Sequence, residues 1–219
     1  MSTASAPRRI TVFGASGAVG LHAVKSALDR GHKVVAHVRT PAKVTIEHPK
    51  LTVLTGELSE REKMRDAVRG SDAVISALGP SLDRKAKDMP LVEGTRNIVD
   101  GMQAEGVQRF IGMATPSLRD PRDGRSALGV SVPFMGRTFL ARAYRELLDM
   151  SQIVIDGDLD WTIARFTRPT DGSPTGTVRA GFLGKDKVGA SITRADIGAF
   201  LVDQLDDDRF HRAAPAISN

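Results

Sequence analysis

The sequence predicts an α/β fold with a doubly wound parallel sheet flanked by helices on both faces. Strand-like apolar runs alternate with helical patterns along the 219 residues, and this alternation is typical of parallel sheets. The first apolar run ends in a glycine-rich turn, Gly14-Ala-Ser-Gly17-Ala-Val-Gly20, which leads into a helical segment. A strand, a glycine-rich turn and a helix in this order open a βαβ unit.

The first half of the chain carries four expected strands. They are short, apolar and bounded by turn residues, and we place them at Ile10–Phe13, Val34–Val38, Leu51–Thr55 and Asp72–Ser76. One helix follows Gly20, and a short helix is expected over Glu60–Arg69 with Ser59 as its N-terminal cap. The fourth strand opens into Ala77-Leu-Gly-Pro80. In a doubly wound sheet this turn lies beside the glycine-rich turn, across the crevice at the carboxyl ends of the strands.

The second half continues the alternation. We expect a helix over Pro90–Glu105 with Gly106 as its stop signal, and strands at Arg109–Met113 and Trp161–Arg165. A further helix is expected from about Gly136 to Asp156, and a last one begins near Thr193 or Ala195. The chain should therefore form one domain over residues 1–219, with its core at about 8–165.

Two irregular segments complete the expected domain. Residues 116–133 contain three prolines and two glycines with little periodicity, which predicts a long loop, either a substrate lid or a plain surface loop. The segment Thr167–Gly176 is rich in glycine, proline and threonine. We expect the stretches at about 116–134 and 167–190 to form a small elaboration on the substrate side of the sheet.

The glycine-rich turn predicts a Rossmann-type dinucleotide site. Such a turn exposes backbone N–H groups at the positive end of a helix dipole, where a pyrophosphate can bind. Gly14 permits the tight turn, Gly17 lets the backbone approach the phosphates, and Gly20 lets the helix pack closely on the strand. Three glycines also occur in ordinary turns, so the second strand of the unit has to support the interpretation.

The residue after that second strand favours NADP over NAD. NAD-binding proteins carry an acidic side chain there, which accepts hydrogen bonds from the adenosine ribose. Here the residue is Arg39, with Lys43 one turn later. A guanidinium has no use for a neutral 2′-hydroxyl group but pairs with a 2′-phosphate. The alternative is that Arg39 is a solvated charge at the end of a strand.

Composition narrows the classes of function. The net charge is +5 and the sequence pI is about 9.8, but the basic residues are scattered and aromatic residues are few. We therefore expect an anionic cofactor rather than a nucleic-acid partner. Without cysteine there is no disulfide, thiolate ligand or cysteine nucleophile, and the five histidines show no metal-ligand spacing. No apolar run could cross a bilayer, and no hydrophobic leader precedes the first strand. We expect a cytoplasmic location, no metal and no membrane partner.

Several motifs together resemble a known family. They are spread almost from end to end of the chain: Thr11-Val-Phe-Gly-Ala-Ser-Gly17, Val38-Arg39, Asp72-Ala-Val-Ile75, Glu93-Gly-Thr-Arg-Asn-Ile98, Gly106-Val107, Leu159-Asp-Trp161 and Ile192-Thr-Arg-Ala-Asp-Ile197. In this order and spacing the chain resembles the atypical short-chain dehydrogenase/reductases, and within them the NADPH-binding flavin reductase and biliverdin reductase B family. The resemblance implies the fold and an NADP(H) cofactor.

The resemblance also implies a set of cofactor-binding residues. The pyrophosphate would be lined by Gly14, Ser16, Gly17, Ala18 and Val19, and the 2′-phosphate would be held by Arg39. Glu57 stands where the family has an Asp beside the adenine, and Leu58 follows it. The nicotinamide ribose would lie beside Ala77, Leu78 and Gly79. Ala114 completes the expected set of cofactor-binding residues.

The resemblance implies two residues on the substrate side. Thr115 falls where relatives carry a serine, and its hydroxyl would donate to a substrate carbonyl or to the nicotinamide carboxamide. Arg168 falls where biliverdin reductase relatives have a histidine, and it is the candidate for pairing with an anionic substrate. The preceding residues, Arg165-Phe-Thr167, replace the more usual arginine-proline-glycine sequence of the family.

The chain departs from the superfamily at its usual catalytic pair. Many members use Tyr-x-x-x-Lys, in which the lysine lowers the tyrosine pKa so that the phenol can move a proton. Here Tyr144 is followed at that spacing by Leu148. We therefore expect Tyr144 to be a helix residue with a hydrogen-bonded hydroxyl. Arginines 137, 142 and 145 are expected to be solvated rather than catalytic.

Three functions remain open at this point. The leading one is an NADPH-dependent reductase that holds a flavin or another planar conjugated small molecule against the nicotinamide, since hydride transfer depends chiefly on proximity. The second is a non-catalytic NADP-binding redox sensor that regulates a protein partner. The third, least favoured, is an epimerase or dehydratase. The sequence makes no prediction of the oligomeric state.

Overall fold

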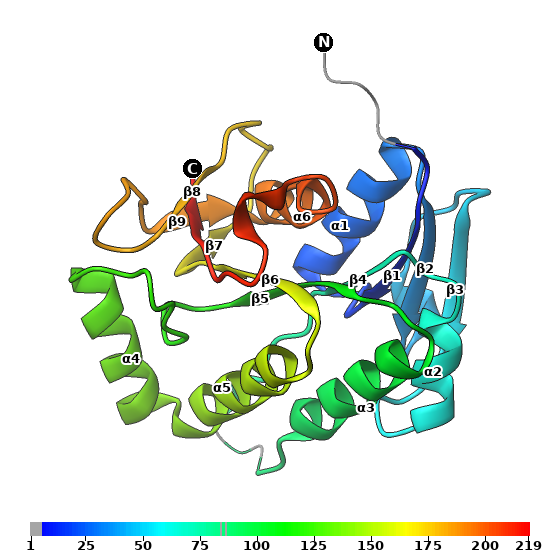
Figure 1. Cartoon of the computed structure of the whole chain (residues 1–219), viewed down its shortest axis with the longest axis horizontal. Helices are drawn as coiled ribbons and strands as arrows, with labels where there is room; N and C mark the ends of the chain where they lie inside the picture. The colour runs from blue at the N-terminus through cyan, green and yellow to red at the C-terminus, as the bar shows by residue number, and fades with distance from the viewer. Residues whose placement is uncertain (1–5, 84, 86) are drawn as a thin grey trace.

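The computed structural model describes residues 6–83, 85 and 87–219 and contains the expected sheet (Figure 1). Its eight strands have the order β3-β2-β1-β4-β5-β6-β10-β8, and only the pair β10 and β8 is antiparallel. The strands of the parallel core are β1 (Arg9–Phe13), β2 (Lys33–Val38), β3 (Leu51–Thr55), β4 (Ala73–Ser76), β5 (Arg109–Ala114) and β6 (Asp160–Arg165). The order 3-2-1-4-5-6 is that of the Rossmann fold, so the predicted fold class is confirmed.

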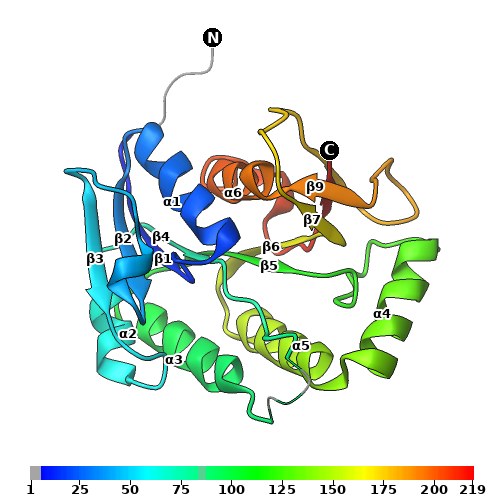
Figure 2. The same ribbon diagram turned by 180° about the vertical axis from the view of Figure 1, so that it is seen from behind.

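Helices cover both faces of this sheet (Figures 1 and 2). One face carries α1 (Ala18–Asp29) and α6 (Arg194–Asp203), and the other carries α2 (Arg61–Val68), α3 (Pro90–Ala104) and α5 (Ala141–Asp156). Each face has its own apolar cluster, which contains Ile10 and Val12 from β1 on the first side and Phe13 on the second. Alternate residues of β1 thus serve the two cores, as expected for a strand buried on both faces.

The helix α2 is shorter than predicted and has no side-chain cap. Its N-cap is Glu60 rather than Ser59. The Glu60 carboxylate accepts a hydrogen bond of 2.7 Å from the backbone N–H of Glu57, so it fixes the turn that enters the helix. The predicted cap from Ser59 is wrong, because the helix begins one residue later and no side chain caps it.

The irregular loop predicted over residues 116–133 is only half correct. Its second part belongs to α4 (Ala127–Phe139), which contains Pro133. A proline inside a helix leaves the carbonyl four residues earlier without its partner, and here that carbonyl, on Gly129, accepts a 3.0 Å hydrogen bond from the Arg119 guanidinium. The helix expected from Gly136 is also wrong at its start, because the chain leaves helical geometry at Leu140 before α5 begins.

The first part of this segment is fixed to the sheet. Asp123 forms an ion pair with Arg165 at the end of β6, with a shortest N–O distance of 2.6 Å. Both side chains are buried, at 1% and 0% exposure. Asp120 accepts a hydrogen bond of 2.8 Å from the backbone N–H of Ala214, in the turn that precedes the last strand. A lid motion of this segment would therefore have to come from α4.

The C-terminal elaboration contains four short strands that the sequence did not indicate. They are β7 (Arg168–Thr170), β8 (Arg179–Gly181), β9 (Ser191–Thr193) and β10 (Ala216–Ser218). The pair β7 and β9 forms a separate two-stranded sheet, whereas β10 and β8 extend the main sheet. Runs of three residues are too short to show a period in the sequence. The last long helix begins at Arg194, one residue from the predicted start.

The carboxylate of Asp196 organises this elaboration. It accepts hydrogen bonds from the backbone N–H groups of Thr175 and Gly176 at 2.9 and 3.1 Å. It also accepts from the Thr193 hydroxyl at 2.7 Å and the Asn219 amide at 2.9 Å. Burial alone would raise the pKa of Asp196, but these hydrogen bonds outweigh it and hold the pKa below its ordinary value.

Replacing this carboxylate should destabilise the protein in a pH-dependent way. We expect Asp196→Asn to lower the Tm at neutral pH by about 2–4 °C for each kcal/mol lost. Because the pKa of Asp196 is depressed in the folded state, its contribution is complete above 3.8, the ordinary value, and is lost as the pH falls through the folded pKa. Thermal unfolding at several pH values should show the two proteins converging in acid. A constant difference would contradict a role for the charge.

None of the described helices is both long and apolar enough to span a bilayer.

Candidate functional site

A cavity of about 590 Å³ lies at the carboxyl ends of β1, β2 and β4. This volume lies within the range usual for small-molecule sites. The cavity is lined by these residues from the predicted cofactor set: Gly14, Ser16, Gly17, Arg39, Glu57, Leu58, Ala77, Leu78 and Gly79. The structure therefore brings together residues from four separate turns of the chain. Ala18, Val19 and Ala114 from the same set are not among its lining residues.

The glycine-rich turn has the geometry that a close backbone approach requires. Gly14 has a φ of +71°, and a Cβ atom there would lie 2.8 Å from the backbone of Ala77. At Gly20 a Cβ atom would lie 2.1 Å from the carbonyl oxygen of Gly14. Any side chain at either position would push the turn, α1 and the end of β4 apart. These two glycines hold the turn tightly between its neighbours, as the sequence predicts.

The amino end of α1 lines the cavity through Gly17. Gly17 is the N-cap residue, no side chain caps the helix, and the first turn holds no acidic residue. First-turn N–H groups have no partner within a helix, and Ala18 and Val19 supply two of them. The helix N-terminus is thus uncompensated and suited to an anion, although the side chains of these two residues lie outside the lining set.

The wall of the cavity at the end of β2 carries an arginine and a buried histidine. Arg39 is exposed at the end of β2, and within residues 6–83, 85 and 87–219 it makes no hydrogen bond or ion pair. His37, two residues earlier, is buried, and its Nε2 atom has no partner in the described part of the chain. Desolvation lowers the pKa of His37, although the charge of Glu60 opposes this. Arg39 places a positive charge at this end of the cavity.

The opposite wall carries an ion pair that sequence reasoning missed. Arg142 and Glu146 on α5 line the cavity and are joined at 2.7 Å, with side chains 19% and 1% exposed. Arg142 also donates to the carbonyl oxygens of Ser81 and Asp88, and Glu146 accepts from the Leu91 N–H at 3.0 Å. The expectation of a solvated Arg142 is wrong, because the segment after β4 folds onto it. The i, i+4 spacing of the two residues was the available signal.

Tyr144 lies outside the cavity. Its hydroxyl accepts a 3.0 Å hydrogen bond from Nε of Arg137, and its ring packs on Gly136 of α4. The expectation of a hydrogen-bonded helix residue is confirmed. A proton transfer by Tyr144 to a ligand in the cavity has no support in this geometry.

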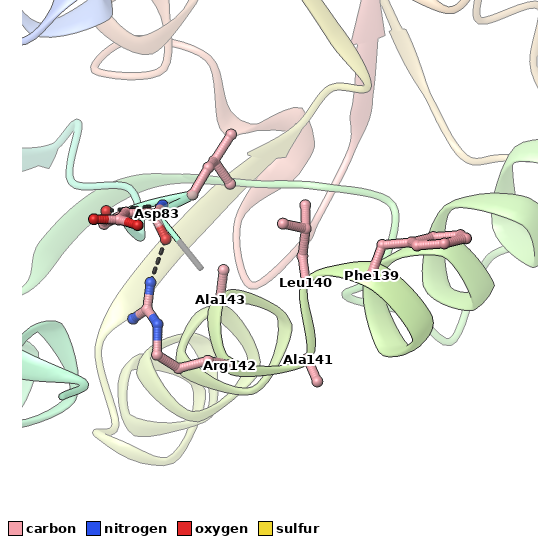
Figure 3. A pocket seen from close by; sticks show the side chains of 8 residues that line it. Asp83, Phe139, Leu140, Ala141, Arg142 and Ala143 are labelled. Carbon is pink, nitrogen blue, oxygen red and sulfur yellow. Dashed lines mark hydrogen bonds between the residues drawn. The ribbon is translucent and has the colours of Figure 1, made fainter. Parts of the chain in front are cut away.

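A second cavity of about 220 Å³ shares lining residues with the first, and Figure 3 draws the side chains that line it. Ser81 and Arg142 line both cavities. Its other lining residues are mostly apolar: Leu82, Asp83, Phe139, Leu140, Ala141 and Ala143. In the close view, Arg142 reaches up from α5 toward the segment that carries Asp83 (Figure 3). Ser81 and Arg142 therefore form the boundary that the two cavities share.

The two predicted substrate-side residues lie outside both cavities. Thr115 follows β5 at its carboxyl end, half-buried, and its hydroxyl oxygen accepts a 3.3 Å hydrogen bond from the Ser117 N–H. Arg168 is exposed on β7. The roles given to them remain predictions. In the described residues, no group of three or more His, Asp or Glu side chains is placed to hold a metal.

A match to a known protein family identifies the class of this site. The family model described as NAD(P)H-binding matches residues 14–208. The chain belongs to this NAD(P)H-binding family. The match begins at Gly14, the first glycine of the turn, and extends beyond α6. The NAD(P)H-binding family expected from the sequence motifs is confirmed.

Relatives of this NAD(P)H-binding protein include dehydrogenases and reductases. A 3-beta-hydroxysteroid dehydrogenase from Mycolicibacterium neoaurum is 37% identical over 120 residues, which are 50% of this chain and 32% of that relative. The chain thus aligns with about a third of the length of that curated relative. Two solved structures share the fold along nearly all of both chains.

Both structures are distant in sequence. ChuY, an anaerobilin reductase from Escherichia coli O157:H7, is 21% identical with a TM-score of 0.75 and covers 96% of each chain. A short-chain dehydrogenase/reductase from Veillonella parvula, solved in complex with NADP, is 17% identical with a TM-score of 0.75. It covers 97% of this chain and 94% of its own. At these identities the likeness establishes the fold.

Proposed function

We propose that the protein is an NADPH-dependent reductase that transfers a hydride to a flavin or another planar conjugated small molecule. The observation that carries the proposal is the 590 Å³ cavity, which joins the glycine-rich turn, Arg39 and the turn after β4. The chemistry of these groups fits a dinucleotide from end to end: backbone amides for the pyrophosphate, a guanidinium for a 2′-phosphate, and small residues beside the nicotinamide ribose.

The preference for NADPH rests on Arg39 and its surroundings. The guanidinium is exposed at the cavity edge and has no partner among the described residues. Lys43 lies in the short 3-10 helix Pro41–Lys43 immediately beyond it. Two cations near one phosphate attract it, and neither gains from a neutral hydroxyl. Glu57 lines the same region and would meet the adenine edge.

The reaction needs orientation more than acid catalysis. When bound, the reduced nicotinamide supplies a hydride to the acceptor, and water supplies the proton that completes its two-electron reduction. The chain holds the reactants together: Ala77, Leu78 and Gly79 form the wall beside the nicotinamide ribose, and Arg142 fixes the segment that follows. Placing two reactants in contact can supply much of the rate enhancement.

Thr115 and Arg168 keep their roles as proposals. The Thr115 oxygen accepts from the Ser117 N–H, which leaves the hydroxyl proton available to donate to an acceptor carbonyl. Arg168 would attract the phosphate or carboxylate of an acceptor that reaches as far as β7. Both substitutions to alanine should leave NADPH affinity unchanged and raise the KM for the acceptor.

A steady-state assay tests the proposed function. Purified protein is mixed with NADPH or NADH, and the loss of reduced nicotinamide absorbance is followed with riboflavin, FMN and simple quinones as acceptors. We expect protein-dependent oxidation that favours NADPH. If calorimetry shows NADPH binding but no acceptor is reduced, the protein is better described as a redox sensor. The turned-away Tyr144 and the missing lysine favour that second candidate over an epimerase.

Removing the phenol of Tyr144 should leave catalysis intact. We expect Tyr144→Phe to retain kcat and KM within about twofold, because the hydroxyl bonds Arg137 and not the cavity. Thr115→Val, measured alongside, replaces one hydroxyl by a methyl group on the proposed substrate side. A large fall in kcat for Tyr144→Phe with unchanged thermal stability would show that the tyrosine takes part in the chemistry.

A further inference from the structure

The helix α4 presents large apolar side chains to solvent. Among the described residues, the exposed large hydrophobic side chains are Val53, Leu82, Val130, Phe134, Met135 and Phe139. Val130, Phe134 and Met135 lie within α4 at 69%, 66% and 58% exposure, and Phe139 ends the helix. Single exposed apolar residues are ordinary, but a cluster on one helix marks an interaction surface.

The position of α4 leaves this surface accessible. The helix stands at the edge of the molecule next to α5 in both views (Figures 1 and 2). It packs on α5 through Gly136, where a Cβ atom would lie 2.7 Å from the Tyr144 ring. Gly129 is its buried residue. One narrow side of α4 is therefore used for packing within the chain, and its apolar side chains are left outside.

The charges around the helix indicate the partner. Residues 124–145 contain Arg125, Arg137, Arg142 and Arg145 and no acidic residue. Arg142 turns inward to Glu146, whereas the other three are exposed. Two copies that met through α4 would bring these arginines together, which is unfavourable. A surface that offers both hydrocarbon and negative charge complements the helix, and an anionic lipid bilayer offers both.

We propose that α4 docks on an anionic phospholipid surface, with Val130, Phe134 and Met135 inserted at the acyl boundary and Arg125 and Arg137 near the lipid phosphates. The expectation of no membrane partner rested on the absence of a spanning segment, and a peripheral helix needs none. The proposal does not depend on turnover. It does place the second cavity, whose rim includes Leu82 and Phe139, beside the bilayer.

Vesicle co-sedimentation tests this docking directly. The full chain is mixed with vesicles of phosphatidylcholine alone or of phosphatidylcholine with phosphatidylglycerol, at low and high salt. We expect binding to the anionic vesicles, weaker binding to the neutral ones, and loss of the difference at high salt because exposed charges are screened. Absence of binding to the anionic vesicles at low salt would overturn the proposal.

Matched variants locate the surface. Phe134→Asp should reduce partitioning onto anionic vesicles by on the order of tenfold or more, since it removes a ring that would insert into the bilayer and adds a charge that the lipid phosphates repel. The milder Phe134→Gln should have a smaller effect in the same direction. Val53→Asp makes the same change of charge at an exposed apolar site on β3 and should bind as the parent does. Thermal unfolding checks that all three fold.

Two results would contradict the assignment to α4. Equal losses for Phe134→Asp and Val53→Asp would show that net charge alone governs binding. A parent protein that is dimeric by sedimentation equilibrium and becomes monomeric with Phe134→Asp would assign the surface to a second copy of the chain instead.

Discussion

Arg39→Ala should abolish the preference for NADPH over NADH. A charge-assisted hydrogen bond contributes about 1.5–3 kcal/mol, and 1.4 kcal/mol corresponds to a tenfold change in affinity. Losing one or two such bonds should weaken NADPH binding by about 10- to 100-fold or more. NADH has no 2′-phosphate, so its affinity should change little. Calorimetric titration of both cofactors into the variant measures the two effects separately.

The control for this variant lies on the same strand. Lys33, exposed at the amino end of β2, is far from the carboxyl-end turns that line the cavity, and Lys33→Ala removes the same unit of charge. We expect it to retain the preference of the parent. If Lys33→Ala and Arg39→Ala weakened NADPH binding equally, long-range attraction by the net charge would explain the preference. A discrimination that survived Arg39→Ala would remove the proposed role altogether.

Asp123→Asn should produce the largest loss of stability. The ion pair between Asp123 and Arg165 is fully buried, and the carboxylate also accepts a 3.0 Å hydrogen bond from the Leu183 N–H. Removing one partner leaves the guanidinium buried without compensation, at a cost of about 3–5 kcal/mol. Because the pair joins the segment after β5 to β6, the C-terminal elaboration should loosen with it. Denaturant unfolding followed by circular dichroism gives the change in free energy.

A surface pair of the same length is the comparison for this variant. Arg194 and Asp171 also meet at 2.6 Å, but the Asp171 side chain is 91% exposed. Exposed pairs contribute about 0–1 kcal/mol, so Asp171→Asn should be close to neutral. Similar free-energy losses for the two substitutions would mean that burial of the Asp123 pair has no energetic consequence.

Features governed by neighbouring residues were predictable from the sequence. The close packing at Gly20 is local, because a Cβ atom there would meet the backbone of Gly14 and Ala15, and the glycine spacing records those contacts directly. Arg39 was predictable for the same reason, since its position depends only on where β2 ends. The parallel sheet with helices on both faces followed from the alternation of elements.

Features that depend on distant contacts were not predictable. Pro133 indicates a loop in any local interpretation, and only the donation from Arg119 to the Gly129 carbonyl explains why a helix continues through it. The sequence around Arg142 predicts a solvated residue. In the fold, Arg142 donates to the carbonyl oxygen of Ser81, which lies in the segment after β4 and 61 residues away along the chain. Contacts of this kind leave no period or spacing in the sequence.

The measurement that tests the central claim most directly is a single-turnover reaction under anaerobic conditions. NADPH and riboflavin are mixed with protein in excess, and flavin reduction is followed with ordinary NADPH and with NADPH deuterated at the transferred position of the nicotinamide. The account predicts protein-dependent flavin reduction that slows with the deuterated cofactor and is lost with Arg39→Ala at limiting NADPH. Saturating NADPH binding without protein-dependent reduction of riboflavin or any quinone tried in its place would contradict it.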